Sequence, residues 1–405
     1  MLHRHVCPNG LRIVLEDMPA VRSVTIGIWI RTGSRNEQKE INGISHFLEH
    51  MFFKGTNKRS ARDIAEDFDA IGGQVNAFTS KEYTCIYAKI LDTHKEYALE
   101  VLADMFFHST FDEEEMAKEK KVVYEEIKMS EDTPDDIVHD LLSQASYGHH
   151  PLGLPILGTE NTLASFKSED LREYMAKTYT PDNIVISVAG NVDDSFMKTI
   201  ESHFGDFKEG HQSREYVKPD FKAEHVERKK DTEQAHLCIG YDGFSLEDKN
   251  IYSLIVMNNV FGGSMSSRLF QEVREERGLA YSVFSYHSSF LDNGLLTIYA
   301  GTGRQHLSEL RETIAETVED LLRNGLTTKE LHNSKEQLKG SLMLSLESTN
   351  SRMSRNGRNE LLLNKHRSLD ELVEEIDAVS LESTSQVIKR IFDNSYSSAL
   401  VCPNV

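Results

Sequence analysis

Two histidines and a glutamate, His46, Glu49 and His50, stand within one helical turn in the segment HFLEH. Histidines four residues apart stack on one helical face, so both imidazoles can reach one metal ion at about 2.0–2.1 Å. Glu49 then lies beside the ion and can act as general base toward a water that the ion acidifies. Random placement of the 17 histidines and 65 acidic residues gives roughly 0.1 matches to this pattern. The segment therefore predicts a hydrolytic zinc site, and an ordinary group of surface side chains is the simpler alternative.

The apolar residues around this motif predict a helix over residues 43–56. At about 100° per residue, His46, Glu49 and His50 share one side of this helix. The opposite side collects five apolar residues that would anchor it: Ile44, Phe47, Leu48, Met51 and Phe52. Asn42 suits the N-cap and Gly55 suits the C′ position, so the pattern also predicts where the helix begins and ends.

A third protein ligand is expected, and the helical segment 113–129 offers carboxylates. Glu119, Val122, Val123 and Glu126 stand at i, i+3, i+4 and i+7, which places both glutamates on one face. The two valines indicate that this face is partly covered. A solvated, charge-rich helix is the alternative interpretation of the same stripe.

Composition argues against several classes of protein. A formal net charge of −20 disfavours nucleic-acid binding, because phosphates need a basic face. No apolar run approaches the roughly 20 residues that span a bilayer, and the N-terminal segment has no secretory h-region. We therefore expect no nucleic acid or membrane as partner and a cytoplasmic location. The cysteines stand apart without a CxxC pair, which disfavours a disulfide framework or a thiolate zinc cluster: Cys7, Cys85, Cys238 and Cys402.

The second half of the chain repeats the order of strands and helices of the first. The glycine turn and strands of 72–90 recur at 277–302, and the helix at 113–129 recurs at 326–342. This is an internal duplication with a period near 210 residues.

The duplication predicts an α+β fold with two domains, each an antiparallel-rich sheet packed with helices on one face. The predicted boundaries are 1–212 for the first domain and 232–405 for the second. A charged linker, 213–231, contains Pro219 and lacks apolar periodicity.

HFLEH is the inverted zinc motif H-x-x-E-H, and the chain resembles the pitrilysin family of inverzincins in its short, processing-peptidase-like form. The resemblance covers essentially the whole chain, including the duplication. It implies one Zn²⁺ per chain, held by His46, His50 and Glu126, with Glu49 as general base. It implies that Glu119 is important for activity without being a ligand. It also implies that the two domains together form half of a clam-shell chamber.

The segment NAFTSKEYT, 76–84, resembles the edge strand of this family, on which a peptide substrate adds as an extra β-strand. The resemblance therefore implies that Asn76, Ala77, Phe78 and Thr79 bind substrate through their backbone.

In VREERGLAYS, Arg274 and Tyr281 match a family pair that holds the substrate or its transition state. Short members of the family have two domains where long members have four. A homodimer of this chain would then supply Arg274 and Tyr281 in trans.

The second half retains no zinc ligand. Aligning FFKGT with VFGGS places Leu254, Met257 and Asn258 at the positions of His46, Glu49 and His50. The later helices place Ser341 opposite Glu126. The second domain is therefore predicted to be inactive toward metal and to contribute substrate-binding residues.

These observations together predict a zinc endopeptidase that hydrolyses peptides or extended leader segments inside a closed chamber. A dedicated leader-processing or transit-peptide-processing peptidase is the nearest alternative. A non-catalytic core or scaffold subunit of the same family is less favoured, because it would not need all four of His46, Glu49, His50 and Glu126. A metal-dependent hydrolase of another small substrate is a further alternative, against which the edge strand and the Arg274–Tyr281 pair argue.

Overall fold

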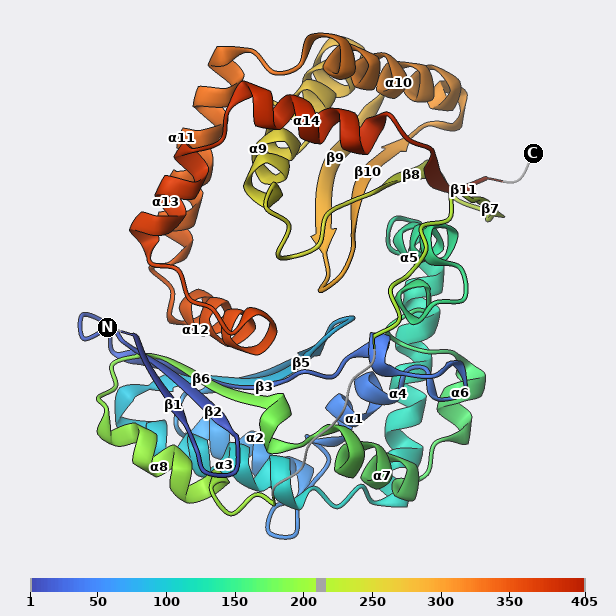
Figure 1. Ribbon diagram of the computed structural model, residues 1–405. Helices are drawn as coiled ribbons and strands as arrows, with labels where there is room; N and C mark the ends of the chain where they lie inside the picture. Colours follow the sequence, from blue (N-terminus) through green and yellow to red (C-terminus); the bar gives the residue numbers. More distant parts are fainter. Residues whose placement is uncertain (1, 209–215, 404–405) are drawn as a thin grey trace. The chain divides into compact units, whose positions relative to one another are not determined.

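The computed structural model describes residues 2–208 and 216–403, and the chain divides into two compact units (Figure 1). The first unit comprises Met1–Ile127, Leu154–Tyr216 and Leu344–His366. The second comprises Lys128–Gly153, Val217–Met343 and Arg367–Val405. Each unit is an α+β structure built on one sheet, as the sequence predicts.

The sheet of the first unit has the strand order β1-β2-β6-β3-β5-β4. Among the described strands of this sheet only β2 and β6 pair in parallel, so the sheet is antiparallel-rich. Its strands are β1 (Leu2–Val6), β2 (Arg12–Asp17), β3 (Ser23–Ile30), β4 (Gln74–Thr79), β5 (Thr84–Leu91) and β6 (Ile184–Gly190). The helices that lie largely in this unit are α1 (Ile44–Met51), α2 (Ala61–Ala70), α3 (Lys95–His108), α4 (Glu113–Asp132), α6 (Glu160–Ser165), α7 (Ser168–Thr178), α8 (Ser195–Phe204) and α12 (Thr349–Arg358).

The sheet of the second unit repeats this plan with the order β7-β11-β8-β10-β9. Its strands are β7 (His225–Lys229), β8 (Ala235–Asp242), β9 (Ala280–Ser289), β10 (Gly294–Thr302) and β11 (Tyr396–Cys402). Its helices are α5 (Pro134–Tyr147), α9 (Ile251–Phe261), α10 (Leu307–Asn324), α11 (Thr328–Ser345), α13 (Leu369–Asp377) and α14 (Leu381–Phe392). The parallel pair β7–β11 corresponds to β2–β6 of the first sheet.

Short 3-10 and π-helical segments join these elements in both units. The 3-10 helices are η1 (Ser34–Asn36), η2 (Lys39–Ile41), η3 (Asp92–His94), η4 (Pro151–Gly153), η5 (Pro181–Asn183) and η7 (Arg304–His306). The π-helical segments are η6 (Phe270–Glu276) and η8 (Asn359–Leu363).

Helices cover both faces of the first sheet, which corrects the expectation of helices on one face. Alternate residues of β3 point to opposite faces. Ile26 and Ile28 lie in the core with α1 and α3, whereas Thr25 and Trp29 face α12 (Figure 1). The Thr25 and Thr349 hydroxyls are 2.9 Å apart. Because β3 is apolar or small on both sides, both faces must be buried, and α12 comes from the second half of the sequence to do so.

The second sheet is covered on both faces in the same way. Leu237 and Ile239 of β8 lie in the main core of this unit, while the intervening Cys238 packs with α5. The hydroxyls of Ser146 in α5 and Ser397 in β11 are 2.7 Å apart. The positions of α5 and α12 in the sequence do not indicate which sheet each one covers. Each helix packs on the sheet built mainly from the other half of the chain.

The boundaries 1–212, 213–231 and 232–405 are predicted from the repeat in the sequence and divide the chain into continuous segments, whereas the compact units are discontinuous. Residues 213–215 of the predicted linker lie outside the described residues. Further along the predicted linker, residues 225–229 form β7, an edge strand of the second sheet.

Within the residues that the structure describes, every helix is too short or too polar to cross a membrane.

Candidate metal centre and active site

Helix α1 carries the HFLEH motif and is anchored by its apolar side. All five residues predicted for that side are almost fully buried: Ile44, Phe47, Leu48, Met51 and Phe52. His46 is buried and His50 is partly exposed, so the polar side opens toward solvent at one end. The periodicity thus predicts the orientation of the helix correctly.

The beginning and end of α1 differ from the prediction. Gly43, not Asn42, is the N-cap residue, with φ of 94°, and the Asn42 amide donates to Glu37 and to the Pro155 carbonyl. Residue Phe52 is the C-cap, so the helix ends before Gly55, which has φ of 116° in the following turn. A left-handed glycine at each turn lets the chain reverse within a few residues on either side of the motif.

The buried carboxylate of Glu37 takes the capping role predicted for Asn42. It accepts hydrogen bonds from the Gly43 and Ser45 backbone N–H groups at 2.7 and 2.9 Å, and from the Asn42 amide at 2.9 Å. Burial raises the pKa of Glu37 to about 7, and the N–H donors hold back part of that rise. No spacing rule points to an acidic residue several positions before a helix, so the sequence offered no signal for Glu37.

The three predicted ligands converge on one point. Glu126 Oε2 lies 3.6 Å from His46 Nε2 and 3.5 Å from His50 Nε2. Ligands of a tetrahedral zinc ion with bonds of 2.0–2.1 Å are separated by about 3.3–3.5 Å, so these donors fit Zn²⁺ with small adjustments. Burial lowers the pKa of His46 to about 3, with a smaller contribution from the charge of His50. The imidazole is therefore neutral, as a metal ligand must be.

Glu119 orients His50 from the side away from this point. Its Oε1 lies 2.7 Å from His50 Nδ1, and its Oε2 lies 2.6 Å from Lys54 Nζ. Burial alone would lower the pKa of His50, but the carboxylates of Glu119, Glu126 and Glu49 outweigh it and raise that pKa. A carboxylate on Nδ1 fixes the tautomer and leaves Nε2 for a metal ion. Lys54, which no motif in the sequence points to, neutralises Glu119.

The face of α4 is only partly covered. Val123 is fully buried and Glu119 nearly so, but Val122 is 51% exposed. The prediction of a partly covered face is therefore confirmed, with Val123 on its covered part and Val122 on its exposed part. Successive residues on a helix are about 100° apart, and the boundary of the covered face runs between these two.

Glu49 lies beside the three ligands and contacts the edge strand. The Thr79 hydroxyl of β4 donates a hydrogen bond to Glu49 Oε2 at 2.6 Å. Burial raises the pKa of Glu49, and the nearby charge of Glu126 raises it further, while the Thr79 hydrogen bond and His50 act in the opposite direction. A carboxylate with a raised pKa is a better proton acceptor near neutral pH.

Strand β4 is the edge of the first sheet, as the family resemblance implies for the segment that contains Asn76, Ala77, Phe78 and Thr79. It pairs with β5 on one side only, with Asn76 opposite Tyr87 and Thr79 opposite Thr84. Its other side offers backbone groups to an added strand.

Arg274 and Tyr281 meet each other in the second unit. The guanidinium carbon of Arg274 lies 4.5 Å from the centre of the Tyr281 ring and 4.8 Å from that of Phe270. Tyr281 is 78% exposed, so its hydroxyl is available to a ligand.

In the second unit, the residues that align with the HFLEH motif have apolar or amide side chains. Leu254 and Met257 are fully buried, and Asn258 bonds Ser285 of β9. Ser341 is exposed on α11. The described residues of this unit contain no group of three histidine, cysteine or acidic side chains with metal-binding geometry.

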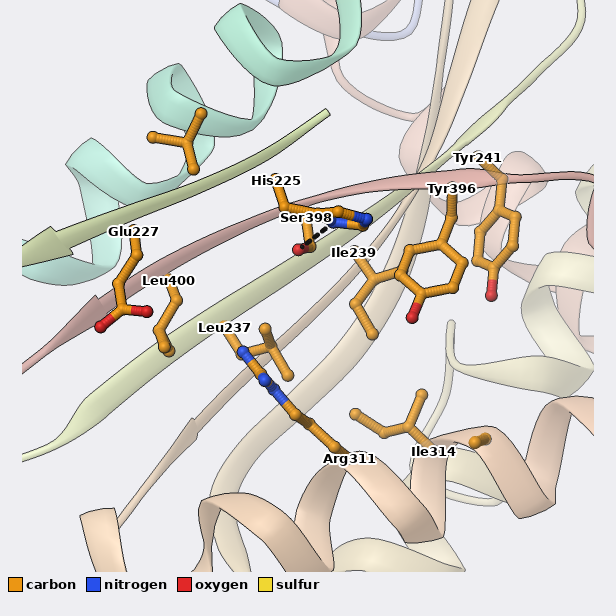
Figure 2. Close-up of a pocket in the computed structure, with 12 residues that line it drawn as sticks. His225, Glu227, Leu237, Ile239, Tyr241, Arg311, Ile314, Tyr396, Ser398 and Leu400 are labelled. Atoms are coloured by element: carbon orange, nitrogen blue, oxygen red, sulfur yellow. Dashed lines mark hydrogen bonds between the residues drawn. The ribbon is translucent and has the colours of Figure 1, made fainter. Parts of the chain in front are cut away.

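A cavity of about 410 Å³ lies in the second unit between its sheet and α10 (Figure 2). Leu237, Ile239 and Leu400 line it from the strands, and Arg311 and Ile314 line it from α10. It contains none of the residues predicted to take part in catalysis.

Comparison with known proteins identifies the class to which this fold and site belong. Residues 12–160 match the family model described as insulinase, peptidase family M16, and residues 165–338 match the model described as peptidase M16 inactive domain. The chain belongs to peptidase family M16.

Among its relatives, the chain is 65% identical over 404 residues to the "Uncharacterized zinc protease YmxG" of Bacillus subtilis (strain 168), covering 100% of this chain and 99% of the relative. It is 40% identical to a protein of Streptomyces coelicolor that is also named a zinc protease, covering 99% of this chain and 90% of the relative. The fold matches the crystal structure of a protease from Helicobacter pylori with a TM-score of 0.93 and 22% identity, over 100% of this chain and 99% of the other. A peptidase M16 inactive domain from Pseudomonas fluorescens matches equally well, with a TM-score of 0.93 and 19% identity, over 100% of this chain and 98% of the other.

Proposed function

We propose that this protein is a zinc metallopeptidase that cleaves peptide bonds within extended polypeptides. The observation that carries the proposal is the convergence of His46, His50 and Glu126 on one point with Glu49 beside it. Membership of family M16 and relatives named zinc proteases support it. We propose one zinc ion at this centre.

Zinc bound by these three residues would polarise a scissile carbonyl and lower the pKa of a water molecule. Glu49 accepts the proton of the attacking water and later donates it to the leaving amine. Thr79 holds the Glu49 carboxylate in place through its 2.6 Å hydrogen bond. Glu119 and Lys54 keep the His50 ring in one orientation.

The substrate in this proposal is an extended peptide paired with β4. Backbone hydrogen bonds to the open edge at Asn76, Ala77, Phe78 and Thr79 would give affinity with loose sequence preference. The contact between Thr79 and Glu49 supports this choice, because it links the edge strand to the proton acceptor. Unfolded peptides and extended leader segments both fit, and a dedicated leader-processing enzyme is the second candidate.

We also propose that Arg274 and Tyr281 contact the substrate. We propose that the enzyme works as a homodimer enclosing a chamber, in which these two residues of one protomer serve the zinc centre of the other. Mixing a Glu49→Gln protein with an Arg274→Ala protein tests this. Complementation in trans restores up to about one quarter of the normal activity, because half of the dimers are mixed and each has one complete site. No recovery from subunits shown to exchange, or a fully active monomer in sedimentation, would refute the dimer.

The peptidase function is tested by comparing the purified protein with its Glu49→Gln variant. We expect equal zinc content in both, and cleavage of a quenched peptide library by the unmodified protein alone. Zinc in both without cleavage in either would favour a scaffold role. Absence of zinc from both would refute the metal centre itself.

A further inference from the structure

A second group of metal-ligating side chains lies in the first unit, where β1 meets α8. His5 comes from β1, Cys7 follows this strand directly, and Glu201 comes from α8. One ligand atom of each lies within 4.8 Å of the other two. Across residues 2–208 and 216–403, only one other set of three side chains meets the same geometric condition, and it is the centre at His46, His50 and Glu126.

The backbone holds these three residues in fixed positions. His5 pairs with Ile13 in the β1–β2 ladder. The Cys7 N–H donates to the Leu11 carbonyl at 2.8 Å, and the Cys7 carbonyl accepts from the Gly10 N–H at 2.9 Å. Ligands on a constrained backbone need little reorganisation to bind an ion.

The end of α8 that carries Glu201 is tied to the same turn. The Asn9 side-chain amide donates to the carbonyls of Phe204 and Gly205 at 3.0 and 3.2 Å. The strand end and the helix therefore form one local framework.

The His5 imidazole has an unsatisfied nitrogen that points into this group. Its Nε2 is shielded from solvent and has no hydrogen-bond partner in the described part of the chain. The nearest carboxylate oxygen, Glu201 Oε1, is 3.7 Å away, which is too far for a hydrogen bond. Buried polar atoms are normally paired, and an orphaned one calls for an explanation such as an ion. The His5 side chain is otherwise 41% exposed, which leaves a route of entry from solvent.

We propose that His5, Cys7 and Glu201 bind a second zinc ion. A thiolate and an imidazole are ligands that zinc prefers and that magnesium and calcium do not. Three protein ligands leave the fourth position to water. On binding, the Cys7 thiol releases its proton to solvent and a sulfur–zinc bond forms. The ion joins the edge strand β1 to α8, so it stabilises the fold independently of the peptidase centre.

Cobalt substitution of the full-length protein tests this proposal. The centre at His46, His50 and Glu126 contains no sulfur, so a thiolate-to-cobalt charge-transfer band in the near ultraviolet reports on the Cys7 site alone. We expect this band in the unmodified protein and in a His46→Ala variant. We also expect two zinc ions per chain at saturation.

Cys7→Ser should abolish the band and remove one zinc ion per chain while peptidase activity is retained. His5→Gln keeps the thiol and should lose the band at stoichiometric cobalt, so it tests the site should Cys7→Ser fail to fold. The matched control is Cys402→Ser, which removes another buried thiol that lies 3.5 Å from a carboxylate, Glu227. Absence of the band at saturating cobalt, or its loss in Cys402→Ser but not in Cys7→Ser, would overturn the proposal.

Discussion

Helices α1 and α9 occupy corresponding positions in the two units. Each contacts a long helix that comes later in the chain, which is α4 for α1 and α11 for α9. In the first unit His50 Nδ1 lies 2.7 Å from Glu119 of α4. In the second unit the Asn259 amide donates to Ser334 of α11 at 2.9 Å. The second unit therefore keeps a polar contact between these helices and replaces ionisable groups with neutral ones. The fold does not depend on the metal-binding residues, which are an addition to it.

A second difference concerns the packing near β6 in the first unit and near its counterpart β11 in the second. In the first unit α8 follows β6, and Phe196, Ile200 and Phe204 of α8 are buried in the core. In the second unit the cavity of about 410 Å³ lies beside β11 (Figure 2). Helix α8 therefore contributes to the core of the first unit, whereas a cavity lies beside β11 in the second.

The largest expected effect, on zinc content and peptidase activity, comes from replacing a zinc ligand of the first unit with the residue type found at the aligned position of the second. His50→Asn introduces the residue type found at the aligned position, Asn258, and removes a zinc ligand. We expect the loss of one zinc ion per chain and a fall in peptidase activity of at least about 10³-fold, because the ion contributes several kcal/mol to catalysis. Metal analysis and peptide-cleavage rates measure both. Asn258→Ala is the matched control and should leave zinc content unchanged, and an active His50→Asn enzyme would contradict the site.

The next effect concerns packing around α8. Ile200 is fully buried in the first unit, and Ile314 of α10 is nearly so but lines the cavity. Ile200→Ala should lower the free energy of unfolding by about 2–5 kcal/mol, with Ile314→Ala at the lower end of that range because the cavity already deprives it of neighbours. Urea unfolding of both variants measures the difference. An equal or larger loss at Ile314 would show that the cavity is filled in solution.

The anchoring of α1 differs from that of α9 and should give a pH signature. The N-cap of α9, Asn250, makes no side-chain cap hydrogen bond, whereas α1 is held by Glu37. Because the native pKa of Glu37, about 7, lies above its ordinary value of 4.5, the native state binds this proton more tightly than the unfolded state. The resulting stability is fully present below about pH 4.5 and is lost as pH rises through 7.

Relative to Glu37→Gln, the unmodified protein should therefore lose about 3 kcal/mol of unfolding free energy between pH 4.5 and 8. Urea unfolding, with zinc bound to both proteins, measures the free energy of unfolding of each across this range. Groups that titrate in both proteins cancel in the difference between the two free energies. A difference that stays constant or grows with pH would show that Glu37 is ionised throughout.

Local patterns predicted the parts of this molecule that depend on neighbours in sequence. The buried side of α1 follows from helical periodicity, and the edge position of β4 was implied by the family resemblance. The pairing of Glu126 with His46 and His50 followed from the resemblance, because a charge-rich helix has many carboxylates and periodicity alone cannot choose among them.

Contacts between distant segments had no local signal. Helix α12 packs on the first sheet because Gly357 leaves room for Trp29, since a Cβ at Gly357 would lie 2.4 Å from the indole nitrogen. Neither residue reveals this partner by its spacing. Glu37 holds the start of α1 at the turn of Gly43, and Lys54 pairs with Glu119 just before the turn of Gly55. Helical periodicity does not determine either turn.

The smallest expected effect tests the comparison at the helix contact itself. Glu119→Gln keeps a hydrogen-bond acceptor for His50 but removes the charge that Lys54 balances, so zinc affinity should fall by about 10–100-fold. Ser334→Ala breaks the corresponding contact in the second unit and should cost only about 1 kcal/mol of stability, with zinc affinity unchanged. Competition with a chelator measures the affinities, and urea unfolding measures the stabilities. Unchanged zinc affinity in Glu119→Gln would reduce Glu119 to the same structural role as Ser334, and the two units would then differ only in the ligands themselves.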